Sequence, residues 1–117
     1  MMIPRPSGNR LEYVAMWILR SVEHTEGPED AAPQFTFRLA TGAIKTIGRS
    51  AGADFIVNAG LVSRLHCRLT AGEESVEAVD LSSTNGTYLN DKRVDRAQVT
   101  SGDRLRVGRV EFTISSE

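Results

Sequence analysis

Three short segments of this 117-residue chain combine arginine with hydroxyl and amide side chains. They are Gly48-Arg49-Ser50, Ser63-Arg64-Leu65-His66 and Ser83-Thr84-Asn85-Gly86-Thr87, with Asn90 shortly after the third. An arginine guanidinium binds phosphate or carboxylate through parallel hydrogen bonds. A serine or threonine hydroxyl adds an uncharged donor, and an asparagine amide donates and accepts at once. These residue types favour recognition of a phosphate or another acidic group.

The same residues do not make a catalytic centre. Ser63 and His66 have the residue types of a nucleophile and its base, but no Gly-x-Ser-x-Gly turn surrounds Ser63 and no third group orients the histidine. The sequence has neither a Gly-x-x-x-x-Gly-Lys phosphate loop nor a His-Glu-x-x-His motif. His24, His66 and Cys67 lie in different contexts, which gives no zinc site. We expect no catalytic residue, no metal ion and no cofactor.

Composition excludes other classes of protein. Fourteen Lys and Arg residues against fifteen Asp and Glu give a net charge of −1, so no overall basic field attracts nucleic acid or a membrane surface. Cys67 is the single cysteine, which excludes an internal disulfide. No apolar stretch approaches the roughly 18 residues that span a bilayer. The sequence predicts a protein located in the cytoplasm, or in the nucleus if the source is eukaryotic.

Short strands must position the three loops. Apolar and polar residues alternate with a period of two along residues 35–39, 65–69, 104–107 and 110–114. Further strands are expected over 16–22, 44–47, 55–57, 76–81, 88–89 and 92–94. Asn90-Asp91 and Gly108-Arg109 are typical of tight turns. Since no segment has helical spacing, the pattern predicts an antiparallel sandwich or barrel whose end loops carry the function.

The chain divides into two parts by composition. Residues 1–15 contain two prolines and a glycine within the first ten positions and show no periodicity, so we expect a flexible N-terminal leader. Residues 16–117 form the expected domain, and the polar segment 23–33 is expected to be a loop. Trp17, Cys67 and Phe112 are candidates for its core.

The order and spacing of the three segments resemble the forkhead-associated (FHA) domain family, which reads phosphothreonine peptides. The family pattern is Gly-Arg, then Ser-Arg-x-His, then Ser-x-Asn-Gly-Thr-x-x-Asn, and all of it is present between Gly48 and Asn90. The resemblance covers about residues 16–115. It implies an all-β, FHA-type β-sandwich of about eleven short, mainly antiparallel strands, with the ligand site in the loops at one end.

The resemblance also implies a role for each motif residue. Five would contact the ligand: Arg49 reaches the phosphate, Ser63 donates its hydroxyl to it, Arg64 adds charge, Thr84 contacts the phosphothreonine region, and Asn85 holds the peptide main chain. His66 would brace the binding loops, and Gly48, Gly86 and Asn90 would set the backbone shape.

Local roles stay open for the same residues. Arg49 could be a solvated charge in a turn, and Ser63 and Thr84 could cap their loops. Arg64 could pair with Asp54 or Asp80.

The sequence therefore predicts a non-enzymatic module that binds phosphothreonine-containing proteins marked by a Ser/Thr kinase and recruits them in signalling. The resemblance implies that the loop before Ser63 reads the third residue after the phosphothreonine, and because the segment Asn58–Val62 carries no charge, we expect a preference for an apolar residue there. The alternative is a phospho-independent interaction or self-association scaffold with the same fold. The oligomeric state is not predicted.

Overall fold

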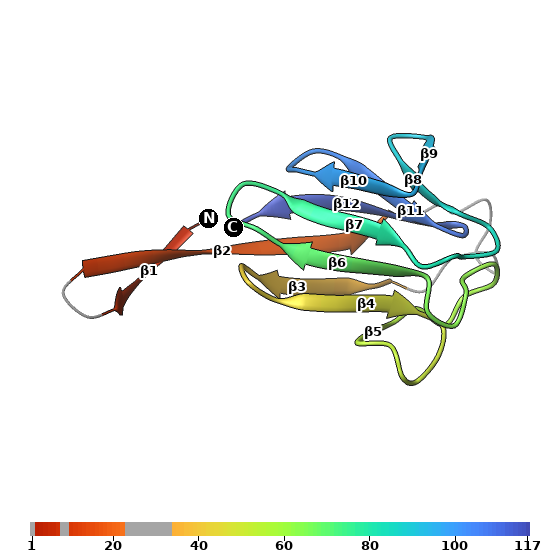
Figure 1. Cartoon of the computed structure of the whole chain (residues 1–117), viewed down its shortest axis with the longest axis horizontal. Helices are drawn as coiled ribbons and strands as arrows, with labels where there is room; N and C mark the ends of the chain where they lie inside the picture. Colours follow the sequence, from red (N-terminus) through yellow and green to blue (C-terminus); the bar gives the residue numbers. More distant parts are fainter. Residues whose placement is uncertain (1, 8–9, 23–33) are drawn as a thin grey trace.

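The computed structural model describes residues 2–7, 10–22 and 34–117, and only the backbone of residues 2–7 and 10–15. All regular structure in these ranges is β-strand, arranged as two sheets packed face to face (Figure 1). The described residues contain no helix long and apolar enough to cross a membrane. The loop predicted over 23–33 lies outside the described residues.

The larger sheet has seven strands in the order β1-β2-β12-β11-β8-β9, and β3 pairs with β2. Its strands are β1 (Met2–Ser7), β2 (Arg10–Ser21), β3 (Thr36–Ala40), β8 (Thr87–Leu89), β9 (Lys92–Val94), β11 (Arg104–Val107) and β12 (Val110–Ser116). The smaller sheet has the order β10-β7-β6-β4-β5. Its strands are β4 (Ile44–Gly48), β5 (Phe55–Ile56), β6 (Cys67–Ala71), β7 (Val76–Asp80) and β10 (Arg96–Val99). Among the described strands, only β4 and β5 pair in parallel.

Alternation along the strands builds the core between the sheets. Every second residue of β6 is buried, beginning with Cys67, and β12 buries Val110, Phe112 and Ile114. Phe37 stacks on Phe55 with ring centroids 4.5 Å apart. The core positions predicted for Trp17, Cys67 and Phe112 are confirmed, since each is at most 3% exposed.

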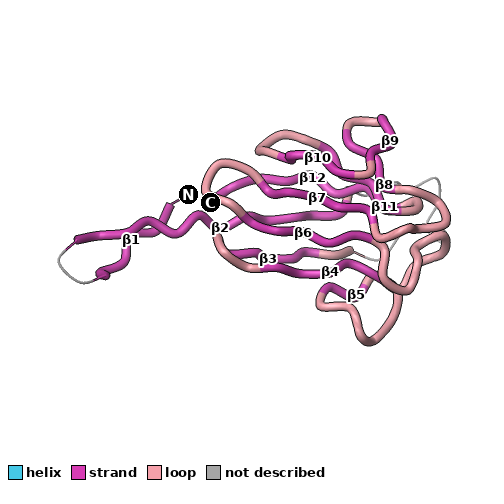
Figure 2. The backbone as a smooth tube through the Cα atoms, in the orientation of Figure 1, coloured by secondary structure: helices cyan, strands magenta, loops and turns pink. Residues whose placement is uncertain are grey.

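Residues 2–7 and 10–15 pair as two antiparallel strands, although their composition without periodicity led us to expect a flexible leader. β1 pairs with residues 10–15 of β2 and extends away from the sandwich (Figure 2). Pro4 and Pro6 are compatible with β1 because it is an edge strand, in which alternate backbone N–H positions face away from the neighbouring strand. The domain boundary at residue 16 stays a prediction. The described strands β2–β12 number eleven, as the resemblance implied.

Three details differ from the predicted elements. β10 was not expected, because Arg96–Val99 carries no clear alternation. Leu65 was placed in phase with Cys67 and Leu69, but it is 47% exposed. His66 was placed in a strand, but β6 begins one residue later. The period of two holds only from Cys67 onward, where the chain joins the sheet.

Strand direction brings the three sequence motifs together. β6 runs antiparallel to both β4 and β7, so the last residues of β4 and β7 lie beside the start of β6. Cys67 pairs with Ile47 on one side and with Asp80 on the other. The loops after β4, before β6 and after β7 therefore emerge at one end of the sandwich, on the right in Figure 1.

Candidate functional site

A cavity of about 500 Å³ lies among these loops. Its lining consists of Arg49, the segment 58–62, Ser63, Thr84 and Asn85. Four of the five residues predicted to contact a ligand are thus brought together around one space. The fifth, Arg64, is exposed but is not part of the lining.

Arg49 is held against the neighbouring loop. Its backbone N–H donates to the Ser63 carbonyl at 2.9 Å, and its side-chain Nε donates to the Val62 carbonyl at 3.1 Å. The two terminal nitrogens of the guanidinium have no partner among the described residues. Gly48 permits this approach, since a Cβ there would overlap the Arg64 carbonyl. Arg49 is therefore oriented through one nitrogen and keeps its other donors for an anion.

Ser63 and Thr84 meet across the cavity. The Thr84 N–H donates to the Ser63 hydroxyl oxygen at 3.1 Å. A hydroxyl can accept this bond and still donate its own hydrogen elsewhere. The Ser63 hydroxyl therefore caps an N–H of the third loop and keeps its own hydrogen for a ligand, so the capping role and the binding role are compatible.

His66 joins the two loops from behind the cavity. The ring is fully buried, and the Ser63 N–H donates to its Nδ1 at 3.0 Å. Since Nδ1 accepts, the hydrogen of the neutral ring is on Nε2, which donates to the Gly86 carbonyl at 2.8 Å. Both ring nitrogens are thus used to fix the separation between the Ser63 and Gly86 loops.

A second network beneath the third loop was not assigned from the sequence. The Ser83 and Thr87 hydroxyls donate to Asp80 Oδ1 at 2.5 and 2.7 Å, and the Ser83 N–H donates to Oδ2 at 3.1 Å. The Gly86 N–H donates to the Ser83 hydroxyl at 2.9 Å. Burial raises the pKa of Asp80, but these hydrogen bonds outweigh it and leave the pKa below its ordinary value of 3.8. The signal in the sequence is an aspartate three residues before a serine, a spacing that suits local turn bonds.

Asn85 closes the other side of the cavity. Its Nδ2 donates to the Leu61 carbonyl at 3.1 Å, which links the third loop to the second. Its amide oxygen has no partner among the described residues and can accept from a peptide N–H. Gly86, next in the chain, has a φ of +90°, which an L side chain rarely adopts. Asn85 is therefore held in the lining of the cavity with its amide oxygen available to a ligand.

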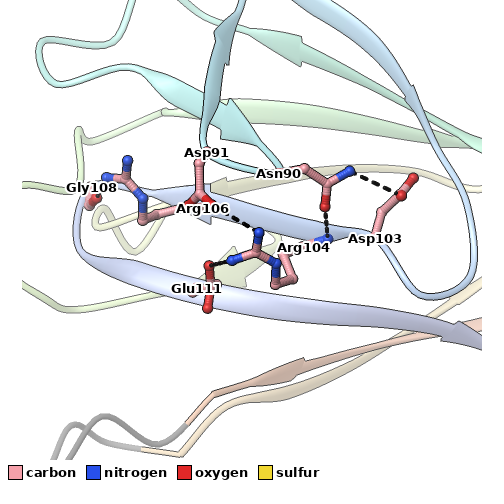
Figure 3. A network of polar contacts seen from close by, with 7 residues as sticks. All are labelled: Asn90, Asp91, Asp103, Arg104, Arg106, Gly108 and Glu111. Carbon is pink, nitrogen blue, oxygen red and sulfur yellow. Dashed lines mark hydrogen bonds and ion pairs between the residues drawn. The ribbon is translucent and has the colours of Figure 1, made fainter.

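Arg64 and Asn90 lie apart from the cavity lining. Arg64 forms no ion pair with any described residue, and its two expected partners are used elsewhere: Asp54 accepts from Thr46 and Asp80 accepts from the third loop. Asn90 occupies the β8–β9 turn with a φ of +49°. Figure 3 shows its amide oxygen accepting from the Arg104 N–H at 2.9 Å and its Nδ2 donating to Asp103 at 3.1 Å. Asn90 fixes this turn to β11 and does not contribute to the cavity.

The lining suits an anion. It includes Arg49, one hydroxyl from each of Ser63 and Thr84, and the Asn85 amide, without an aspartate or glutamate. No three His, Cys, Asp or Glu residues in the described part of the chain lie close enough together to hold a metal ion. The geometry therefore favours hydrogen bonding to an acidic group by preset donors.

Known proteins and solved structures with similar sequences or folds include a regulator and FHA domains. The chain is 34% identical over 67 residues to the glycogen accumulation regulator GarA of Mycobacterium tuberculosis, which covers 57% of this chain and 41% of GarA. It is also similar to a structure from a study of phosphothreonine-dependent FHA domain interactions. The identity is 28% and the TM-score 0.68, and the match covers 86% of this chain and 95% of the other. The FhaA FHA domain complexed with the intracellular domain of Rv3910 matches with 28% identity, a TM-score of 0.65 and coverage of 86% and 98%.

The match to GarA spans less than half of that relative's length. The FHA domain family matches residues 45–108, which include all three loops and more than half of the chain. This chain therefore belongs to the FHA domain family.

Proposed function

We propose that this protein binds phosphothreonine peptides in the cavity between its three loops, without catalysis. The observation that carries the proposal is the convergence of Arg49, Ser63, Thr84 and Asn85 on one space that contains no carboxylate. Arg49 and Ser63 bind the phosphate, and Arg64 adds positive charge from outside the lining. Asn85 bonds to the main chain of the peptide.

The energetics of such a site are sufficient for a signalling contact. Phosphothreonine carries a charge of about −1.5 to −2 at neutral pH. Hydrogen bonds to charged groups contribute about 1.5–3 kcal/mol each. Three such bonds contribute about 4.5–9 kcal/mol. Together with the main-chain contact of Asn85, which offsets the cost of ordering the peptide, they support a binding free energy of about −8 kcal/mol, which corresponds to a micromolar dissociation constant.

The relatives support a protein partner for this site. One similar structure comes from a study of phosphothreonine-dependent FHA domain interactions, and another is an FHA domain in complex with the intracellular domain of Rv3910. The partners we propose are phosphothreonine-containing proteins produced by a Ser/Thr kinase, which the module recruits in a signalling pathway within the cytoplasm. Nucleic acid and membrane are not among the proposed partners.

The segment 58–62 is proposed to read the third residue after the phosphothreonine. It lines the cavity and carries no charge. Leu61 is 47% exposed there and has a φ of +69°. An apolar side chain on the peptide would cover this leucine, whereas an aspartate would lose hydration without gaining a cation.

The test is fluorescence anisotropy with three degenerate peptide libraries: phosphothreonine, phosphoserine and unphosphorylated threonine. Micromolar binding to the phosphothreonine library, with weaker binding to phosphoserine and none without phosphate, is expected. Equal binding to the unphosphorylated library, or none to any library by folded protein, contradicts the proposal and favours a phospho-independent scaffold. A preference for aspartate over leucine or isoleucine at the third position contradicts the role given to segment 58–62.

A further inference from the structure

A row of basic and aromatic side chains crosses the outer face of the larger sheet next to the cavity. Arg93 on β9 pairs with Tyr88 on β8, which pairs with Arg106 on β11. Directly paired residues of antiparallel strands point to the same face, so these three side chains form one cross-strand row. We call Arg93, Tyr88 and Arg106 the basic row.

Gly86 connects the basic row to the cavity. A Cβ at Gly86 would lie 2.9 Å from the Arg93 Nε and 3.2 Å from a Tyr88 ring carbon. The arginine and the aromatic ring therefore lie directly over this glycine, one residue from Asn85. Any larger residue at position 86 would displace Arg93.

Arg106 connects the same row to the second loop. Its guanidinium lies 3.9 Å from the centre of the Tyr88 ring, and its Nη1 donates to the Gly108 carbonyl at 3.0 Å. Figure 3 shows this side chain directed toward Gly108 and away from Arg104. A Cβ at Gly108 would lie 2.6 Å from the Leu61 carbonyl, the same carbonyl that accepts from Asn85. The basic row thus lies beside the rim formed by Asn85 and Leu61.

The charges of the basic row are not neutralised within the described part of the chain. The Arg93 side chain is exposed and forms no hydrogen bond or ion pair there, and Arg106 forms no ion pair. The next residue across the sheet, Glu111, is bound at 3.2 Å by Arg104, which also binds Asp91 at 2.8 Å. Those two carboxylates are therefore already paired with a different arginine (Figure 3).

We propose that the basic row, with Arg93 as its main cation, binds a second acidic group of the peptide, flanking the phosphothreonine. This inference rests on the proposed function, since the peptide is placed by the cavity. An extended peptide advances about 3.3 Å per residue, so the rim at Asn85 and the adjacent row lie within a few residues of the phosphate. The acidic group is the carboxylate of Asp or Glu or a second phosphate, and both suit arginine.

The experiment uses phosphothreonine peptides with leucine fixed at the third position after the phosphothreonine. Glutamate, alanine or phosphoserine is placed in turn at each of the remaining positions within four residues of the phosphothreonine, on either side. Affinities for the whole chain are measured by fluorescence anisotropy. The variants are Arg93→Gln, which loses no internal hydrogen bond, and Arg96→Gln, a matched change of an exposed arginine on β10 in the other sheet.

Glutamate at one or more positions is expected to tighten binding about two- to fivefold, and phosphoserine there by more. Arg93→Gln is expected to remove most of this gain while binding the alanine peptide as the unchanged protein does. Arg96→Gln is expected to keep the gain. Comparing glutamate with phosphoserine distinguishes the two sources of the acidic group.

Two results would overturn the inference. In the first, the alanine peptide binds, but an acidic residue at no position raises the affinity, or the increase persists in Arg93→Gln. The basic row then does not read the peptide, and the proposed function stands. If no phosphothreonine peptide binds, both proposals fail.

Discussion

The Thr84 N–H donates a hydrogen bond of 3.1 Å to the Ser63 hydroxyl, and this bond joins two loops that are 21 residues apart in the chain. The bond fixes the position of the serine oxygen and occupies only an acceptor site on it. The hydroxyl hydrogen is left for the cavity. One atom thus takes part in loop structure and in the proposed contact with phosphate.

Replacing Ser63 with alanine should separate these two roles. Ser63→Ala removes one hydrogen bond to a charged group, so binding to a phosphothreonine peptide should weaken about 10- to 100-fold. The lost bond from the Thr84 N–H lies at an exposed site, where water can replace it, so the free energy of unfolding should fall by less than about 1 kcal/mol. Ser50→Ala, whose hydroxyl lies outside the cavity lining, is the control. Binding by Ser63→Ala within twofold of the unchanged protein would exclude the serine from the contact.

His66 should affect stability more than any exposed residue of the site. His66→Ala leaves the partners of both ring nitrogens, the partly buried Ser63 N–H and the buried Gly86 carbonyl, without a bond and creates a cavity. We expect a loss of about 2–5 kcal/mol in the free energy of unfolding, measured by urea denaturation. Leu65→Ala, at a half-exposed neighbour, should cost less than about 1 kcal/mol. Equal stabilities for the two variants would argue against a bracing role.

Much of the fold could be predicted from local pattern. Alternation predicted the inner faces of β3, β6, β11 and β12, and the turn at Asn90-Asp91 is confirmed by their φ angles of +49° and +71°. β10 was missed because pairing with β7, and not its own sequence, makes Arg96–Val99 a strand. Leu65 was misplaced because the alternation was extended beyond the point where β6 begins.

The candidate site was partly predictable as well. Residue types and spacing indicated the three loops, the resemblance to the FHA family implied Arg49, Ser63, Thr84 and Asn85 as ligand contacts, and strand direction brings these four together. The contact of Arg93 with Gly86 could not be predicted, because it depends on the register between β8 and β9. Asp80 was missed as a support because the Asp80–Ser83 spacing is common in turns, and only the folded turn after β7 brings the Thr87 hydroxyl to the same carboxylate.

Asp80 should make stability depend on pH in the acidic range. Its hydrogen bonds outweigh burial and lower its pKa below 3.8, so the folded protein favours the ionised carboxylate. That contribution is complete above the pKa of the unfolded chain and is lost as pH falls through the lower pKa of the folded state. The stability difference between the unchanged protein and Asp80→Asn should therefore be constant from pH 7 to about 5 and should narrow below pH 4 in urea titrations. A difference that widens on acidification would contradict the network.

Cys67 should be inert in the folded protein. Burial raises the pKa of its thiol to about 12, so almost no thiolate forms at pH 8. A thiol reagent such as Ellman's reagent should label Cys67 only as fast as the protein unfolds, and at once in urea. Rapid labelling without denaturant would show that β6 is more open than this packing allows.

The most direct test of the proposed phosphate site measures both peptide binding and thermal stability in Arg49→Ala. Loss of the bond to the Val62 carbonyl should lower the melting temperature by at most about 8 °C. Anisotropy against the phosphothreonine library should show at least a hundredfold loss of affinity, whereas Arg96→Ala, on β10 at the far edge of the same sheet, should bind normally. If Arg49→Ala binds as tightly as the unchanged protein, or loses binding only because it unfolds, Arg49 is not the phosphate contact and the proposed site is wrong.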